Sequence, residues 1–161
     1  MDKSAQQSGF TLIEVVIYLA LFAIMFSGAV TAAYSIMESS GRNQTRAMMQ
    51  EEGEFLLAKI NWAVSNAQTA TVPEGGRLAA TVGADAIELA QNGNDLTLKR
   101  NADPVAALNN SAVSVKNLFF MDISASSNGI KGISYEFDLE GKTPNGATLT
   151  SNFASTAYLR K

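Results

Sequence analysis

The sequence lacks both cysteine and histidine. Without cysteine there is no disulfide framework, and without either residue most nucleophile–base pairs and transition-metal sites are excluded. The formal net charge is −3, and the sequence contains no cluster of Lys and Arg, which argues against non-specific binding of nucleic acid. We therefore expect a protein that is not an enzyme, with no cofactor, no metal and no nucleic-acid partner.

The longest apolar run also lacks proline and, with one exception, charged residues. Residues 10–33 include one charged side chain, that of Glu14, and no proline. As a helix these 24 residues would span about 36 Å, enough to cross a hydrocarbon core of about 30 Å. Apolar side chains at nearly every position predict a helix that faces lipid or other helices on all sides.

The exception within this run is Glu14. A carboxylate inside a membrane costs about 2.5–3.5 kcal/mol, so it usually has a partner. If the chain began at Phe10, its α-ammonium would lie at the same depth. A helix cannot easily fold its first residue back onto its fifth, but an axially shifted neighbouring helix brings the two groups together. Breaking a buried ion pair is costly, and such a pair therefore suits the setting of register. These residues predict cleavage after Gly9 and side-by-side packing of many copies.

Residues 8–15, Ser-Gly-Phe-Thr-Leu-Ile-Glu-Val, resemble the processing site of type IV prepilins and of the pseudopilins of type II secretion systems. The resemblance implies that a prepilin peptidase and methyltransferase cuts between Gly9 and Phe10 and N-methylates Phe10. It also implies that Glu14 guides the subunit into a helical filament. The implied partners are other pilin or pseudopilin subunits and an inner-membrane assembly platform.

Two features depart from the family pattern. The leader has one lysine, Lys3, offset by Asp2, where the family usually has a more basic leader. The membrane helix has no proline, so a kink would have to come from residues 27–28. Many pilins also close their C-terminal region with a disulfide, whereas this chain would depend on packing.

The chain organisation predicted from these patterns has four parts. Residues 1–9 are the leader, residues 10–36 the transmembrane and filament-core helix, residues 37–70 an amphipathic helix, and residues 71–161 a β-rich head. Apolar residues recur at spacings of three and four over residues 48–67, which indicates an amphipathic helix with Trp62 in its core stripe. Gly53 is expected to weaken this helix, and a break between Gly28 and Gly41 is left open.

The head is predicted to be antiparallel. Residues 86–90 and 96–100 suggest a hairpin whose turn places Asn92 and Gly93 at positive φ. Further strands are expected at residues 112–123, 133–139 and 153–160. The expected fold class is α+β, with a long N-terminal helix packed on a small antiparallel β-sheet head, a pilin-like fold. Glu51, Glu52 and Glu54 are interpreted as a solvated helix face rather than a metal site.

Three functional hypotheses remain. The favoured one is a structural subunit of a type IV pilus or type II secretion pseudopilus. A fainter similarity of residues 56–67, 96–100 and 115–120 to J-type pseudopilins and W-type minor pilins favours a minor subunit. One alternative is a filament-tip or surface-binding module on the same scaffold, through loops such as residues 101–110. The other is a signal-anchored extracytoplasmic domain, either an enzyme or a plain domain, although no catalytic constellation supports an enzyme. Lys3 on the short N-terminal side predicts a single-pass inner-membrane protein with its head outside, which then joins a periplasmic or extracellular filament.

Overall fold

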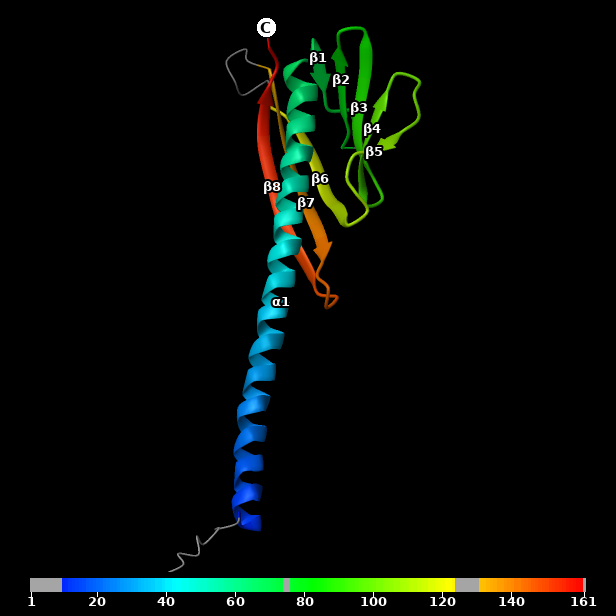
Figure 1. The fold of residues 1–161 in the computed structure, drawn as a ribbon. Helices are drawn as coiled ribbons and strands as arrows, with labels where there is room; N and C mark the ends of the chain where they lie inside the picture. Colours follow the sequence, from blue (N-terminus) through cyan, green and yellow to red (C-terminus); the bar gives the residue numbers. More distant parts are fainter. Residues whose placement is uncertain (1–9, 74–75, 124–130, 161) are drawn as a thin grey trace, which may run out of the picture. The chain divides into compact units, whose positions relative to one another are not determined.

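The computed structural model describes residues 10–73, 76–123 and 131–160 of the chain (Figure 1). The chain divides into two compact units, residues 1–40 and 41–161, which are described separately. The expected leader, including Gly9, lies outside the described residues, as does the expected connection at residues 124–129.

One helix, α1 (Leu12–Ser65, 54 residues), accounts for nearly all of the described residues before the strands. It continues through Gly28 and Gly41, so the break considered between them is not present. Inside the apolar part, the hydroxyls of Ser27 and Thr31 donate to the carbonyl oxygens of Ile24 and Ser27 at 2.8 and 2.9 Å. These polar groups are satisfied within the helix itself, as an apolar environment requires.

The helix ends five residues earlier than the sequence pattern indicates, so the expected end at Ala70 is wrong. Beyond Ser65, the Asn66 side chain donates to the carbonyl oxygen of Trp62 at 2.9 Å and so satisfies one of the last helical acceptors. The following Thr69 and Thr71 belong to strand β1 (Thr69–Thr71). Threonine is β-branched and suits a strand, and pairing with β2 outweighs the continuation of the helix.

In the part of the chain that the structure describes, the strands form two antiparallel sheets, one with five strands and one with three. The first follows chain order, β1-β2-β3-β4-β5, with β2 (Leu78–Val82), β3 (Asp85–Asn92), β4 (Asp95–Arg100) and β5 (Ala106–Ala107). The second is β6-β7-β8, with β6 (Val113–Asp122), β7 (Gly132–Lys142) and β8 (Thr148–Tyr158). The α+β class with antiparallel sheets is therefore confirmed, while β1, β2 and β5 are strands that the sequence pattern did not indicate.

The predicted hairpin is present as β3 and β4, but its turn is tighter than expected. Asn92 pairs with Asp95, which leaves a two-residue turn of Gly93 and Asn94. Gly93 has a φ of 62°, whereas Asn92 is not among the residues with positive φ. A glycine at the first of two turn positions is the pattern of a type II′ turn, which matches the twist of the flanking strands.

Strand β7 shows the alternation that the sequence predicts. Ile133, Tyr135, Phe137 and Leu139 are buried, and the residues between them are more accessible. Strand β6 is less regular, because its pairing with β7 shifts register between Lys116 and Phe119. The bulge leaves Phe119 57% exposed while Phe120 is 2% exposed, so only one of these two neighbouring rings joins the core.

The core of the second unit joins the residue 41–65 part of α1 to the β6–β8 sheet, which Figure 1 shows alongside each other, and also includes Leu78, Leu89 and Leu96 of the first sheet. Two glycines permit this close approach. A Cβ on Gly53 would overlap the ring of Phe153, and a Cβ on Gly141 would lie 2.8 Å from Sδ of Met49. Gly53 is thus a packing residue, in addition to the weak helix former that the sequence indicates.

The expectation that Trp62 belongs to the core is wrong, since Trp62 is 42% exposed. At about 100° per residue, Trp62 is about 200° around the helix from Ile60, which is fully buried. Phe55, also 42% exposed, lies on the same outer side as Trp62. The buried stripe is narrower than the apolar pattern because one helix can press only one side against the sheet.

On the accessible face of β7, the carboxylate of Asp138 is held by two asparagine side chains. Asn117 donates to its Oδ2 at 2.7 Å and Asn152 donates to its Oδ1 at 2.9 Å. The bonds from Asn152 and Asn117 hold the pKa of Asp138 below its usual value. The bonds also join all three strands of the sheet, because Asn117 lies on β6 and Asn152 on β8.

We expect this arrangement to give the head a specific acid sensitivity. The folded-state pKa of Asp138 is lowered, so its carboxylate stabilises the folded head fully above the ordinary aspartate pKa of about 3.9. This stabilisation is lost as pH falls through the folded-state pKa. The Asp138→Asn variant should be less stable than wild type near neutral pH, and the difference should shrink in acid. Denaturant unfolding of the detergent-solubilised full chain across this pH range measures it. The exposed Asp103→Asn variant is the control, and a pH-independent difference for Asp138→Asn would contradict the assignment.

Candidate functional site: the start of helix α1

Helix α1 begins at the segment that the sequence singles out, and Thr11 caps it. The backbone N–H of Glu14 lies 3.1 Å from the carbonyl oxygen of Thr11 and 3.4 Å from its hydroxyl oxygen. Threonine followed three residues later by glutamate is the spacing of a capping box. Glu14 therefore lies in the first turn of α1, where the helix dipole favours a negative charge.

The carboxylate of Glu14 has a side-chain partner on the same helix. The Tyr18 hydroxyl donates to Oε1 of Glu14 at 3.2 Å, one turn along α1. The ring of Phe10 meets the ring of Tyr18 edge-on, with centroids 6.2 Å apart and planes at 68°. Glu14 and Tyr18 are four residues apart and so share one side of α1. Phe10 comes just before the helix begins, and its ring contact places it at that same side. The spacing of Tyr18 from Glu14 is visible in the sequence, but a tyrosine in an apolar run is equally compatible with helix packing.

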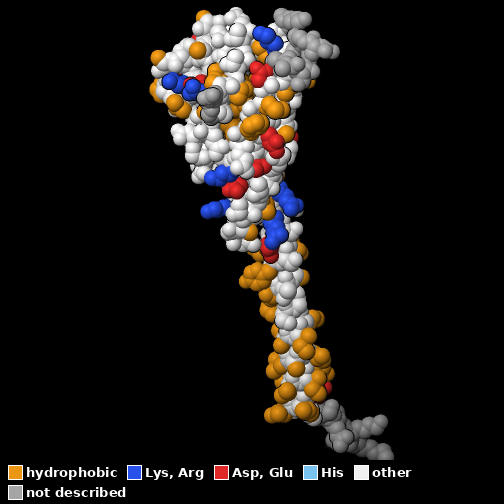
Figure 2. Space-filling model, turned by 180° about the vertical axis from the view of Figure 1, so that it is seen from behind, with side chains coloured by type: hydrophobic (Ala, Val, Ile, Leu, Met, Phe, Trp, Pro, Cys, Tyr) orange, Lys and Arg blue, Asp and Glu red, His pale blue; other side chains and the backbone are white. Residues whose placement is uncertain are grey.

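The rest of this unit presents apolar side chains to its surroundings. Figure 2 shows hydrophobic side chains gathered over the visible surface of the N-terminal part of α1. Glu14 is partly buried, whereas Ile13 and Val15 beside it are 64% and 45% exposed. The helix contains a stretch long and apolar enough to cross a membrane, and none of that stretch is buried by other parts of the protein. Such a surface needs lipid or other helices as its environment.

Comparison with protein families places a known motif on this segment. The family model of the prokaryotic N-terminal methylation motif matches residues 4–30, which include Gly9, Phe10 and Glu14. The chain carries the N-terminal motif of type IV prepilins and pseudopilins. No curated protein and no solved structure matches the chain. The prepilin motif and one apolar N-terminal helix are together consistent with a membrane-anchored, single-pass protein.

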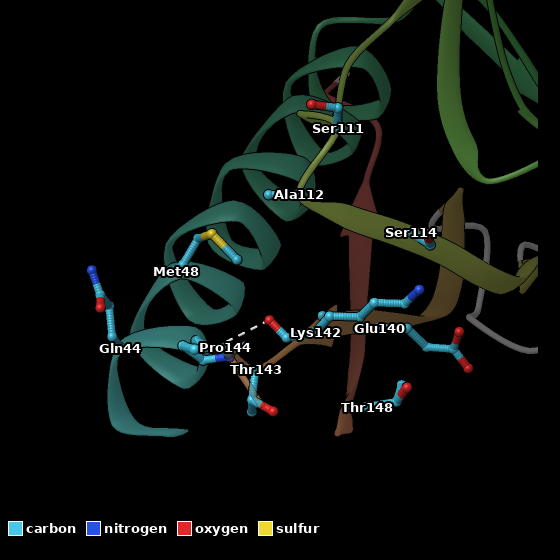
Figure 3. Close-up of a pocket in the computed structure, with 12 residues that line it drawn as sticks. Gln44, Met48, Ser111, Ala112, Ser114, Glu140, Lys142, Thr143, Pro144 and Thr148 are labelled. Carbon is cyan, nitrogen blue, oxygen red and sulfur yellow. Dashed lines mark hydrogen bonds between the residues drawn. The ribbon is translucent and has the colours of Figure 1, made fainter. Parts of the chain in front are cut away.

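The second unit contains a pocket of about 630 Å³ between α1 and the strands. Figure 3 shows Gln44 and Met48 of α1 on one side and Glu140, Lys142 and Thr148 on the other. At the rim, the Thr45 hydroxyl lies 3.5 Å from the carbonyl oxygen of Lys142. Five of the twelve lining residues are serine or threonine. Within residues 10–73, 76–123 and 131–160, no group of three or more His, Cys, Asp or Glu side chains could hold a metal. The prepilin motif favours a structural subunit over an enzyme.

One of the three glutamates interpreted as a solvated face has a structural contact. Glu52 is partly buried, and its two carboxylate oxygens accept hydrogen bonds from the backbone N–H and the side-chain Nδ2 of Asn110, both at 2.8 Å. Glu51 and Glu54 are exposed, as expected. Glu52 therefore ties α1 to the loop before β6, and this contact between residues 58 positions apart has no local signal in the sequence.

Proposed function

We propose that this protein is a structural subunit of a type IV pilus or a type II secretion pseudopilus. In this proposal it is cleaved between Gly9 and Phe10, N-methylated at Phe10, and assembled into a helical filament through the first part of α1. The prepilin motif supports a pilin- or pseudopilin-like role. The single observation that carries the assembly step is Glu14, one carboxylate on an otherwise uncharged and uncovered apolar stretch.

The proposed mechanism is electrostatic register. Cleavage creates a new α-ammonium at Phe10, four residues and about 6 Å of helical rise from Glu14. A neighbouring helix shifted by about that distance along the axis brings its ammonium level with Glu14. In a low-dielectric environment an unpaired carboxylate is costly. The axial register that pairs Glu14 with the ammonium is therefore strongly preferred over other registers. The apolar surfaces of the two helices then pack together.

The similarity of the head to J-type pseudopilins and W-type minor pilins favours a minor subunit, located at the filament tip or in a priming complex. The exposed Phe55 and Trp62 support a second contact surface, because they leave an apolar side of α1 uncovered within the second unit. We place the protein in the inner membrane before assembly, with the N-terminus inside and the head outside. Its partners are the prepilin peptidase and methyltransferase, the assembly platform and other subunits.

A binding module on the same scaffold is the second candidate function. It is favoured by Phe119 and Met121, which are 57% and 48% exposed on the face of β6 that turns away from the core. Exposed apolar side chains of this kind often mark a contact with another protein. In a mutant with Phe119→Ser and Met121→Ser, normal filament incorporation with loss of attachment or substrate transfer would favour this candidate.

The test of the proposed function is intact-mass and N-terminal analysis of the protein from its native membrane. Wild type should begin at an N-methylated Phe10, and Gly9→Ala should block cleavage. Glu14→Ala should be cleaved normally but should enter filaments at least about a hundredfold less well, since removing one partner of a buried ion pair costs about 3–5 kcal/mol. A wild-type chain that still begins at Met1 or Asp2 in a host with active peptidase would overturn the proposal.

A further inference from the structure

We infer that Tyr18 is a positioning residue for Glu14, which holds the carboxylate in the membrane and presents it to the incoming subunit. The inference rests on the proposed function of Glu14 and extends it to a second side chain of the same helix. Its basis is the bond from the Tyr18 hydroxyl to Oε1 of Glu14 at 3.2 Å and the edge-on contact of Phe10 with the Tyr18 ring.

The Glu14 carboxylate needs a hydrogen-bond donor inside the membrane. Hydrocarbon offers no water to a carboxylate, so its cost falls only if the protein supplies a hydrogen bond. Among the described residues of the first unit, Tyr18 is the side chain that donates to the Glu14 carboxylate. Two other hydroxyls of this unit, those of Ser27 and Thr31, donate instead to backbone carbonyl oxygens of their own helix. Tyr18 is thus distinguished by the group to which it donates.

The geometry of Tyr18 suits it to orient the Glu14 carboxylate. A tyrosine side chain is long enough to reach back one helical turn, and the ring of Phe10 lies against that of Tyr18. The ring contact limits the rotamers of Tyr18, so the hydroxyl is aimed rather than free to swing. A carboxylate accepts several hydrogen bonds, and a donor on Oε1 leaves Oε2 to receive the α-ammonium of the neighbouring helix. Tyr18 therefore orients the group on which assembly depends without occupying the whole of it.

Tyr18 acts on Glu14 both before and during filament assembly. Before assembly, Tyr18 is the partner that makes Glu14 tolerable in the bilayer. During assembly, the ammonium adds to a carboxylate that is already oriented, so less conformational freedom is lost when the pair forms. Phe10 takes part in both stages, because its ring contacts Tyr18 while its backbone nitrogen becomes the new amine after cleavage. The three residues act as one device on one side of α1.

The test compares Tyr18→Phe, which removes only the hydroxyl, with Tyr34→Phe on the same helix, where Tyr34 is 69% exposed. Each change is made in the full chain with Glu14 and with Glu14→Gln, and only cleaved protein is compared. Tyr18→Phe should lower filament incorporation about tenfold, as expected for a lost hydrogen bond to a charged group. In the Glu14→Gln background the same change should have little further effect, and Tyr34→Phe should have none in either.

A second readout separates positioning from packing. Infrared spectra of the full chain in lipid vesicles, with the Glu14→Gln spectrum subtracted, isolate the carboxyl band of Glu14. That band should shift in Tyr18→Phe and stay in place in Tyr34→Phe. An unshifted band, or an equal loss of incorporation in both Glu14 and Glu14→Gln backgrounds, would overturn the role of Tyr18. If Glu14→Ala itself assembles normally, the proposed function fails instead, and the infrared band still decides whether Tyr18 holds Glu14.

Discussion

Replacing Gly53 with alanine is expected to destabilise the head by about 2 kcal/mol or more, although alanine is the better helix former. The new Cβ would overlap Cζ and Cε1 of Phe153 and lie 2.7 Å from Cε2. The ring cannot move aside, because it is stacked on Phe137 at a centroid distance of 5.5 Å and is only 7% exposed. Alanine gains up to about 1 kcal/mol of helix propensity over glycine. This gain does not offset the cost of forcing α1 away from the β6–β8 sheet.

The matched control is Gly28→Ala in the same helix, where nothing lies within 4 Å of the added atom. Gly28→Ala makes the same gain in helix propensity without the overlap. Because Gly28 lies in the first unit, the free energy of unfolding of the head should not change. Denaturant unfolding of the detergent-solubilised full chain can be followed by the fluorescence of Trp62, the one tryptophan in the sequence. The double variant Gly53→Ala with Phe153→Leu should recover part of the loss. Equal stability of Gly53→Ala and wild type would show that α1 does not approach β8 this closely.

Replacing Asn109 with aspartate, a change of almost no volume, is expected to cost on the order of 3 kcal/mol near neutral pH. Asn109 is 8% exposed, and its Oδ1 accepts from the backbone N–H of Leu96 at 2.8 Å. Its Nδ2 donates to the carbonyl oxygen of Val113 and to Oδ1 of Asp95, both at 3.1 Å. Aspartate keeps the acceptor but loses both donors, and it places a second carboxylate against Asp95. The strands β4 and β6 would lose a shared anchor.

The pH dependence of this variant identifies the cause. Burial and the neighbouring Asp95 raise the pKa of the new carboxyl in the folded state, so its penalty appears as pH rises through the ordinary aspartate value and fades in acid. Ionisation at position 109 thus destabilises the fold, whereas ionisation of Asp138 stabilises it, and both variants should differ most from wild type near neutral pH. The exposed Asn43→Asp on α1 is the control and should change stability by less than about 0.5 kcal/mol. A pH-independent loss in Asn109→Asp would point to altered packing instead of lost donors.

Local patterns predicted much of the fold. The apolar, membrane-length start of α1, the β3–β4 hairpin and the buried side of β7 follow from apolar spacing and from one glycine in a turn, features that depend on neighbouring residues. The predictions that were wrong depended on distant partners. The helix end is decided by pairing between β1 and β2, and the exposure of Trp62 by which side of α1 meets the sheet. Glu52 appeared solvated because Asn110 is far away in sequence.

The start of α1 was the part most accessible to sequence reasoning. Gly9, Phe10 and Glu14 stand beside an uncharged run, and a membrane-length helix with one carboxylate has few interpretations. Tyr18 needed the structure, because a tyrosine in an apolar helix is compatible with packing as well as with a hydrogen bond. Only the 3.2 Å contact distinguishes the two.

The sequence by itself determined that this protein has a prepilin motif, an apolar N-terminal helix and an antiparallel head, because processing motifs and periodicity are properties of contiguous residues. The tertiary structure alone decided that Gly53 must remain small, that Asn109 joins β4 to β6, and that Glu52 holds a loop. Each of these depends on atoms that folding brings together from distant positions, and no local pattern encodes a distance between them.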